Sequence, residues 1–524
     1  MELTADQALQ QAIAAHKEGK LEEAERLYRD ILQTQPRHPD ANHNLGVLEV
    51  SLNKSEVALP LFKTAVEVNP NIEQFWISYI DALIKENQFE NAKEVLEQGE
   101  KTGLTKAIID VLTQQLISAK KGQIPFQMPS YTKLNSLLEH YQNGRYNDAE
   151  KSAISITQQF PNHPFSWKVL GDVLKKTGRI SESLVASQKA VEIDPLDAGA
   201  HNNLGNTLKE LGRLEESEAS FRQVVAIKPD FAEAWVNLGN TLQSLGRLED
   251  AEENYRNAIE LKPNYAYAFW SLSGVAKTIP DAEHWIDKCL TADANHVDAK
   301  LIKAALRFYQ GDRADFDNLM QSKFKQHSYM RSFSWVFSLP NLPNLYFNRW
   351  SFFDAIVKIS IRSRPFYEFG VWRAVAFKYL IKSFKKGYGF DTFTGLPEDW
   401  DVEKGLEKGT YSSDGNVPNI KGGEFIVGKF EDTLPIFYSE RRPLASVINF
   451  DADLYSSTIC ALNFSKSVMD KHTILIFDEL IMNESWEQDE FKALNEFSSI
   501  NNCTYEVVAI SFFTKQVAVK LIGI

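Results

Sequence analysis

The sequence of 524 residues contains only three cysteines: Cys289, Cys460 and Cys503. They form no CxxC pair and no other spacing typical of metal ligands, which indicates reduced thiols and excludes a disulfide framework. The chain also lacks an apolar run approaching 18 residues, and its first residues contain no apolar signal core. Neither standard secretion nor membrane spanning is expected, so the sequence predicts a cytoplasmic protein.

The sequence contains fewer basic than acidic residues: 57 Lys and Arg against 70 Asp and Glu, which gives a net charge of -13. Nucleic acids and anionic membrane surfaces require dense Lys and Arg, so neither is an expected partner. The apolar content of 44% and charged content of 24% are typical of globular proteins. A chain of this length exceeds one hydrophobic core and predicts two or three domains.

A 34-residue period organises the first 310 residues. Three kinds of residue recur at this spacing: Pro161, Pro195, Pro229 and Pro263; Gly144, Gly178, Gly212 and Gly246; Ala149, Ser183, Ser217 and Ala251. The glycine suits a left-handed turn between two helices, the small residue allows close helix packing, and the proline ends each unit. The pattern resembles the tetratricopeptide repeat, most clearly from Ala234 to Pro263.

An earlier array keeps the same spacing, with Gly19, Asn53 and Asn87 at the turn position. The interval from Asn87 to Gly144 exceeds one period, which predicts a joint between two arrays within 120–130. We therefore predict a first array over 1–120 and a second over 121–310 that ends in a degenerate cap.

Three asparagines each fall eight residues after a proline that closes a repeat: Asn44, Asn203 and Asn237. This position resembles the asparagine ladder of the O-linked N-acetylglucosamine transferase superhelix, which implies a protein or peptide partner on the concave face of the repeats. Equivalent positions in other repeats depart from the pattern: Ser78, Val169 and Ser271. The alternative interpretation is that the asparagines are solvated or cap local turns.

Short apolar runs alternate with helical segments from Pro365 onward, which is typical of a parallel sheet with crossover helices. The predicted strands lie in FYEFGVW, GYGFDTF, EFIVGKF, SVINFDADL, TILIFDELI, TYEVVAISFF and QVAVKLIGI. Only Thr514 and Lys515 separate the last two, so these two should form an antiparallel hairpin. The aromatic-rich segment 332–353 is predicted to form lead-in helices, within a linker over 311–350.

Ligands of open parallel sheets bind beyond the carboxyl ends of the strands. Gly370 follows the first predicted strand, with Glu368 beside it, and Asp391 ends the second, where a carboxylate can accept hydrogen bonds from ribose hydroxyls. Trp372 and Ala374 stand where a dinucleotide site requires glycine, so NAD is not expected.

Asp451 and Asp478 end two further predicted strands, and adjacent strands lie only about 5 Å apart. No Lys or Arg is near them in the sequence, so their carboxylates should repel unless a cation or a proton relieves them. All-oxygen ligands suit Mg²⁺. The alternative is that these acids cap helices or solvate loops.

Five ordered motifs give a more specific resemblance: EFGVW, GFDTFTGLPEDW, GKFEDTLP, NFDADLYSST and IFDEL. Together they resemble the macrocin O-methyltransferase family, which methylates sugar hydroxyls with S-adenosylmethionine and a divalent metal. The resemblance implies a cofactor site at Glu368, Gly370, Asp391 and Phe393. It also implies a Mg²⁺ site at Asp451, Asp478 and Glu479, with Asp453 as the general base. The family commonly carries Gly at the position of Ala374 and often His at that of Asn449.

The predicted fold is an α-solenoid followed, over 351–524, by a class I methyltransferase domain with a mostly parallel, seven-stranded Rossmann-like sheet. The expected function is methylation of a sugar hydroxyl on a glycan or glycosylated metabolite, with the repeats docking a partner or the acceptor. The alternative is a repeat scaffold whose methyltransferase-like domain is inactive.

Overall fold

The computed structural model describes residues 5–17, 20–52, 54–102, 131–399 and 408–524, together with isolated positions between 104 and 129. Packing divides the chain into two compact units, Met1–Thr207 and Leu208–Ile524. The division falls inside a helix of the repeat region, α12 (Ala198–Glu210). The predicted domain boundaries at residues 120, 310 and 350 stay predictions.

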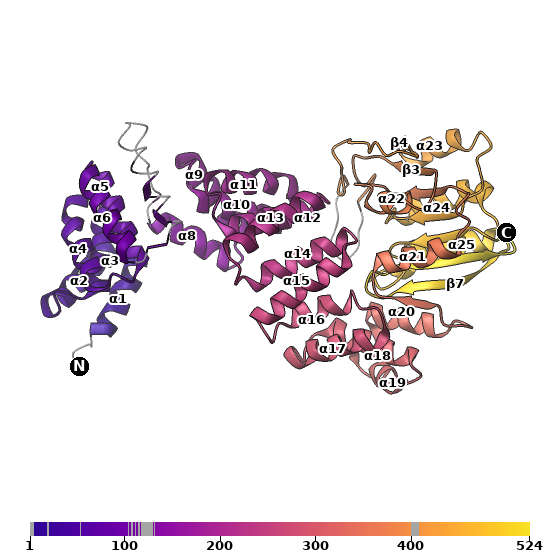
Figure 1. The fold of residues 1–524 in the computed structure, drawn as a ribbon, viewed down its shortest axis with the longest axis horizontal. Helices are drawn as coiled ribbons and strands as arrows, with labels where there is room; N and C mark the ends of the chain where they lie inside the picture. Colours follow the sequence, from indigo (N-terminus) through magenta and orange to yellow (C-terminus); the bar gives the residue numbers. More distant parts are fainter. Residues whose placement is uncertain are drawn as a thin grey trace. The chain divides into compact units, whose positions relative to one another are not determined.

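Unit 1 is built from antiparallel helices packed in sequence order (Figure 1). They are α1 (Ala5–Lys17), α2 (Leu21–Thr34), α3 (Pro39–Ser51), α4 (Ser55–Val68), α5 (Glu73–Lys85), α6 (Phe89–Thr102), α8 (Tyr131–Gln142), α9 (Tyr146–Gln159), α10 (Pro164–Lys176) and α11 (Ile180–Ile193). Gly144 and Gly178 lie in left-handed turns with φ of 70° and 80°, and Ser183 is fully buried between helices. The predicted roles of the repeated residues are confirmed here. Gly19, Asn53 and nearly all of 120–130 lie outside the described residues.

Unit 2 begins with the same helical repeat. Its first helices are α13 (Leu214–Ile227), α14 (Ala232–Ser244), α15 (Leu248–Leu261), α16 (Ala266–Ser273), α17 (Ile279–Ala292), α18 (Val297–Tyr309), α19 (Ala314–Met320) and α20 (Ser328–Phe337). Gly212 and Gly246 again occupy left-handed turns, with φ of 66° and 79°.

One eight-stranded sheet completes unit 2. Its strands are β1 (Asn344–Tyr346), β2 (Phe366–Phe369), β3 (Gly387–Asp391), β4 (Gly423–Val427), β5 (Val447–Phe450), β6 (Ile474–Phe477), β7 (Thr504–Ser511) and β8 (Val517–Ile522), in the order β1-β7-β8-β6-β5-β2-β3-β4. The helices between them are α21 (Arg349–Ile359), α22 (Val375–Leu380), α23 (Phe430–Phe437), α24 (Tyr455–Ser465) and α25 (Glu490–Ile500). Short 3₁₀ helices occupy Lys323–Gln326, Lys466–Val468 and Trp486–Gln488.

The sheet differs from the predicted one in two respects. It is mixed, because β8 pairs antiparallel with both β6 and β7 while the other neighbours are parallel. It also has an eighth strand, β1, which pairs with β7 inside the segment predicted to be helical. The prediction of a mostly parallel, seven-stranded sheet is therefore wrong, whereas the antiparallel hairpin of the last two strands is confirmed.

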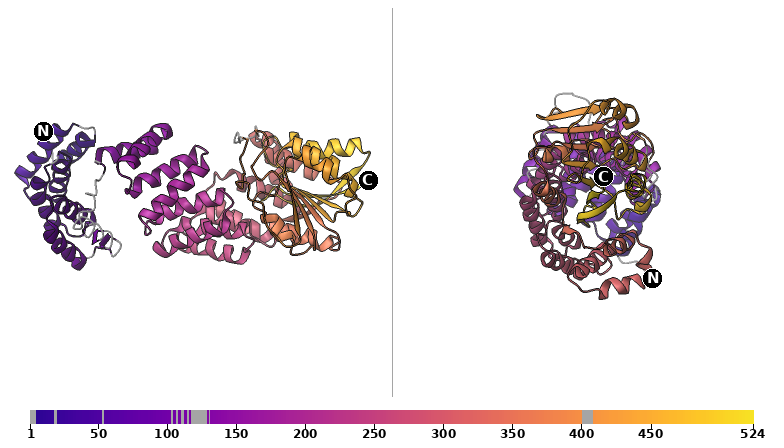
Figure 2. Two further views of the ribbon diagram at one scale, coloured as in Figure 1. Left: turned by 90° about the horizontal axis from the view of Figure 1, so that it is seen from above. Right: turned by 90° about the vertical axis from the view of Figure 1, so that its right-hand side faces the viewer.

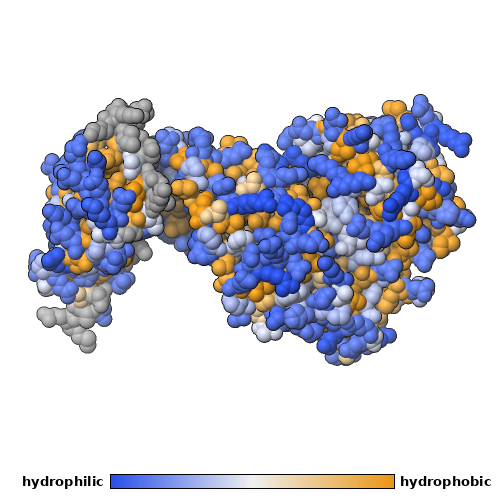
Figure 3. Space-filling model, in the orientation of Figure 1, coloured by the Kyte–Doolittle hydropathy of each residue, from blue (hydrophilic) through white to orange (hydrophobic). Residues whose placement is uncertain are grey.

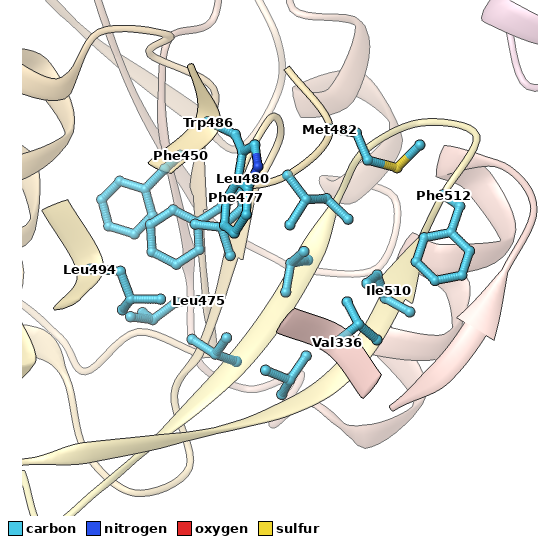
Figure 4. Close-up of a cluster of buried hydrophobic side chains, with 14 of the residues drawn as sticks. Val336, Phe450, Leu475, Phe477, Leu480, Met482, Trp486, Leu494, Ile510 and Phe512 are labelled. Atoms are coloured by element: carbon cyan, nitrogen blue, oxygen red, sulfur yellow. The ribbon is translucent and has the colours of Figure 1, made fainter. Parts of the chain in front are cut away.

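Side chains alternate between the two faces of the sheet, as the period of a strand requires. Phe366 and Ile474 belong to a cluster with α21 and α22, while Tyr367 and Leu475 point into the opposite cluster. Helices accordingly lie on both sides of the strands (Figure 2). In the second cluster the rings of Phe450 and Phe477 stack at 5.0 Å (Figure 4).

The second cluster also joins the last repeats to the sheet. Phe269, Ile286 and Ile302 of α16, α17 and α18 are buried in the same cluster as Phe512 and Val519. The repeats of unit 2 therefore share a hydrophobic core with the α/β region.

Hydrophilic residues predominate on the face of the molecule shown in Figure 3, and apolar residues form scattered groups. Among the described residues, no helix is both long and apolar enough to cross a membrane.

Candidate functional site

The strand order reverses at β2, which pairs with β3 on one side and with β5 on the other. Such a switch point is where open α/β sheets bind ligands. A cavity of about 580 Å³ opens at this edge. Seven of the predicted site residues line it: Glu368, Gly370, Asp391, Asp451, Asp453, Asp478 and Glu479.

Phe393 is the predicted site residue that the structure does not bring to the cavity lining. Its side chain is fully buried in the core on the α22 side of the sheet, 6.2 Å from the ring of Phe425. Only its backbone N–H reaches the site region, donating to Asp391 Oδ1 at 2.6 Å.

Asp391 organises the loop that follows β2. Its Oδ2 accepts hydrogen bonds from the backbone N–H groups of Val371 and Trp372, both at 2.7 Å. With the bond from Phe393, three of about four acceptor positions on this carboxylate are filled within the chain. At most one acceptor position on this carboxylate is left for a ribose hydroxyl. Fixing the loop is therefore the main role of Asp391, and a ligand contact is secondary.

Gly370 permits a close approach of two strand ends. It has φ of 85°, and a Cβ atom at this position would lie 1.8 Å from the carbonyl oxygen of Asp451. Only glycine fits here. Gly370 also lines the cavity, and its assignment to a cofactor site stays a prediction.

Ala374 has a backbone conformation that favours glycine. It is buried and left-handed, with φ of 59°, directly before α22. A residue with a Cβ atom costs roughly 1 to 2 kcal/mol in this conformation relative to glycine.

The carboxylates of the cavity are strongly perturbed. Burial, together with Asp478, raises the pKa of Asp451 well above its ordinary value. Burial and the neighbouring Glu479 and Asp478 do the same to the pKa of Asp453. Burial also raises the pKa of Glu368. A cluster of buried acids that destabilise one another's charges is typical of functional sites.

Arg349, at the first turn of α21, is the cation that the acid cluster requires. Its Nη2 donates to both carboxylate oxygens of Asp478, at 2.7 and 2.5 Å. Burial opposes the charge of this guanidinium, but the nearby Asp478, Asp451 and Glu368 raise the pKa of Arg349. Arg349 and Asp478 are 129 residues apart in the chain, so a search for basic residues close in sequence could not find the pair.

The predicted Mg²⁺ ligands do not fit a metal site as they are arranged. Asp478 already accepts from Arg349, and its Oδ1 also accepts from Gln516 Nε2 at 2.6 Å. Glu479 accepts at Oε2 from Asn483 Nδ2 at 2.7 Å. No group of three or more His, Cys, Asp or Glu side chains in the described part of the chain is disposed to hold a metal ion.

Sequence reasoning also missed the aromatic and repeat-derived walls of the cavity. Trp350, Trp372 and Tyr411 line it, and so do Lys209 and Gln243 from the repeats. The Trp residues carry no motif that distinguishes them from core aromatics, and the repeat positions become visible only in the folded chain.

Two asparagines of the predicted ladder have partners within the chain. Asn44 Oδ1 lies 3.3 Å from the neighbouring His43 Nδ1, and Asn203 Nδ2 donates to the carbonyl of Lys168 in the preceding repeat at 3.4 Å. The role of the asparagines in binding a partner stays a prediction.

Comparison with known families identifies the repeats. Models described as tetratricopeptide repeat match residues 9–71 and 232–265, and a model described as TPR repeat matches 171–212 and 205–246. The N-terminal part of the chain therefore consists of tetratricopeptide repeats. These matches end at residue 265, before the sheet begins. No curated protein matches the sequence.

Several solved structures are similar over the repeats. MamA is 20% identical, with 30% of this chain and 95% of MamA covered and a TM-score of 0.28. YrrB, described as a TPR protein with an unusual peptide-binding site, is 19% identical, with 46% and 95% covered and a TM-score of 0.20. PilF of Pseudomonas aeruginosa is 16% identical, with 38% and 95% covered and a TM-score of 0.35.

Proposed function

We propose that this chain is a repeat-based docking protein whose α/β region is an S-adenosylmethionine-dependent O-methyltransferase acting on a sugar hydroxyl of a glycan or glycosylated metabolite. The repeats support a role in protein interaction, since solenoids of this kind expose extended binding surfaces. Their partner in this proposal is a protein or peptide.

The observation that carries the proposal is the predominance of acidic side chains in the cavity lining. Seven carboxyl groups line it: Glu368, Asp391, Glu431, Asp451, Asp453, Asp478 and Glu479, against five basic side chains: Lys209, Arg349, Arg373, Lys429 and Lys515. Because the acidic groups outnumber the basic ones, this lining favours a sulfonium and an ammonium group over the phosphates of a nucleotide. S-adenosylmethionine carries both cations. The plan of five parallel strands followed by an antiparallel hairpin supports the same assignment.

Asp453 is the residue best suited to take the proton of an acceptor hydroxyl. Its raised pKa makes its carboxylate a stronger base than that of an exposed aspartate. Arg349 forms an ion pair with Asp478 in the lining of the same cavity. When bound, S-adenosylmethionine would supply the methyl group and leave as S-adenosylhomocysteine, and Asp453 would accept the proton of the acceptor hydroxyl. No step is assigned to Mg²⁺, because Arg349 already neutralises the carboxylate that would bind it.

A second candidate is a scaffold that binds a partner without catalysis. Two observations favour it: the family matches all fall within the repeats, and Asp391 has most of its acceptor capacity filled by backbone amides.

Calorimetric titration with S-adenosylmethionine and transfer of labelled methyl groups to sugar acceptors separate the two candidates. We expect binding and transfer, undiminished by excess chelator, and a loss of about 10² to 10⁴ in rate for Asp453→Asn with unchanged cofactor affinity. Asp432→Asn, at an exposed position of α23, is the matched control. Absence of cofactor binding favours the scaffold, and activity that requires Mg²⁺ contradicts the role given to Arg349.

A further inference from the structure

Two repeat turns of unit 2 form part of the cavity wall. Lys209 and Gln243 occupy the same position in successive repeats, 34 residues apart, and both line the cavity, as does Gly212. The repeat period therefore presents equivalent side chains along one edge of the solenoid, and the α/β region covers that edge.

The turns are held against the α/β region by specific contacts. Arg373 Nε donates to the carbonyl of Leu211 at 2.9 Å, and Trp350 Nε1 donates to the carbonyl of Gln243 at 2.5 Å. A Cβ atom on Gly212 would lie 2.7 Å from the indole of Trp372, so this packing leaves no spare space. Together with the shared hydrophobic core, these contacts make the turns a fixed wall of the site.

Lys209 is the unusual group in this wall. Its ammonium has no hydrogen bond or salt bridge among the residues that the structure describes, although seven carboxyl groups line the same cavity. Burial lowers the pKa of Lys209, with Glu210 opposing the shift. A largely buried cation without a close partner is costly, and a ligand anion would remove that cost.

We propose that the turns at 209–214 and 243–244 are a built part of the ligand site, and that the Lys209 ammonium binds an anionic group of the ligand. Four other basic side chains line the cavity, Arg349, Arg373, Lys429 and Lys515, but each has a hydrogen-bond or ion-pair partner. Lys209 is therefore where a carboxylate or phosphate of the ligand is favoured. A ligand with both charges is thereby oriented, its cations toward the acids and its anion toward the repeats. The anion belongs either to the cofactor, whose identity rests on the proposed function, or to an acidic acceptor.

Calorimetry on the full chain distinguishes these sources, with S-adenosylhomocysteine, 5′-methylthioadenosine and inorganic phosphate as probes. The second probe lacks the amino-acid carboxylate of the first. If Lys209 binds the cofactor carboxylate, Lys209→Gln weakens S-adenosylhomocysteine binding at least tenfold. Binding of 5′-methylthioadenosine stays unchanged, and Lys209→Arg retains affinity for both nucleosides. Lys175→Gln is the matched control, because Lys175 has the same repeat position but lies 3.6 Å from Asp172.

If the anion belongs to the acceptor, Lys209→Gln leaves both nucleosides unaffected and weakens phosphate binding at least tenfold. Unchanged affinity for all three probes overturns the inference, provided that circular dichroism shows the variant to be folded; Lys209→Arg replaces it if it is not. Failure of the native chain to bind either nucleoside contradicts the proposed function alone, since the phosphate arm still tests Lys209. Failure to bind any of the three probes overturns both.

Discussion

At the scale of single residues, Gly178 and Gly212 occupy the same turn of successive repeats but have different surroundings. Both are left-handed, so alanine should cost roughly 1 to 2 kcal/mol at either position. Only at Gly212 would the added methyl group meet an indole, that of Trp372, whose Nε1 donates to the Ser412 carbonyl at 3.3 Å. Overpacking should add about 1 to 3 kcal/mol there.

We expect Gly212→Ala to speed hydrogen exchange in β2 and in the loop 370–374, and Gly178→Ala to leave exchange there unchanged. Residue-resolved exchange is the suitable measurement because a repeat protein does not unfold in a single step. Equal effects of the two variants on this exchange would show that the turn at Gly212 does not stabilise the loop of the site.

His163 gives unit 1 a defined dependence on pH. Its side chain is 7% exposed, and burial lowers the pKa of the ring from 6.5 to about 4. The folded state therefore favours the neutral ring, and between pH 6.5 and 4 the unfolded chain binds the proton first. Stability contributed by this residue is complete above pH 6.5 and falls on acidification, by about 2 kcal/mol at pH 5.

The comparison is between the native chain and His163→Gln, with exchange-derived stability of α10 measured at pH 7 and pH 5. The native chain should lose about 2 kcal/mol more than the variant between these values. The other residues of unit 1 are the same in both proteins, so their contributions cancel in the difference. An identical pH dependence would mean that folding does not lower the pKa of the His163 ring.

The acid cluster illustrates what the sequence can predict of a site. The positions of Asp451 and Asp478 after two strands were sufficient to predict that their carboxylates lie close together and need a cation or a proton. The cation that pairs with Asp478 depends on where α21 packs, and Arg349 lies in a segment whose sequence carries no corresponding signal. Phe393 is a different case, because the family resemblance alone implied its ligand contact, and its apolar side chain turns into the core.

At the scale of elements, the start of α21 positions two residues of the site. Asn348 is 2% exposed, and its Oδ1 accepts from the backbone N–H of Ser351 at 2.9 Å. This cap fixes the first helical turn, which carries Arg349 and Trp350. Asn348→Ala should lower stability by about 1 kcal/mol, because the helix loses its N-terminal cap. It should also weaken cofactor binding several-fold, because the helical turn that positions Arg349 and Trp350 is no longer fixed.

Thr278→Ala is the matched control for this variant. Thr278 caps α17 in the same way, accepting from Asp281 N–H at 3.3 Å, but it does not line the cavity. It should lower stability by a similar amount and leave the affinity measured by calorimetry unchanged. A comparable loss of affinity in both variants would indicate a general loosening of unit 2.

Strands were predictable where the local sequence itself has the pattern of a strand. Seven runs of apolar and β-branched residues each contain a strand, and the short link at Thr514 and Lys515 was sufficient to predict the hairpin. β1 was not predictable, because its three residues show no period and extend the sheet only by pairing with Ala509–Ser511 of β7. An edge strand of this kind depends on a partner far along the chain.

At the scale of the whole molecule, the sequence pattern predicts boundaries at residues 310 and 350, which stay predictions. The structure includes everything from Leu208 onward in one compact unit, so the last repeats share that unit with the α/β region. Sequence periodicity cannot reveal this, because a helix keeps the same pattern whether its apolar face covers another repeat or a sheet.

We therefore expect two truncated proteins to differ in folding and in cofactor binding. A protein of residues 198–524, which keeps all of α12, should fold and bind cofactor like the full chain. A protein of residues 311–524 loses the buried partners contributed by α16, α17 and α18, among them Phe269, Ile286 and Ile302, together with the wall that carries Lys209. Loss of one large buried apolar side chain costs about 2 to 5 kcal/mol, and several are removed at once. The shorter protein should bind a hydrophobic dye, lack a cooperative thermal transition and bind no cofactor. If it folds and retains native affinity, the α/β region is independent of the repeats, and the wall at 209–214 contributes nothing to binding.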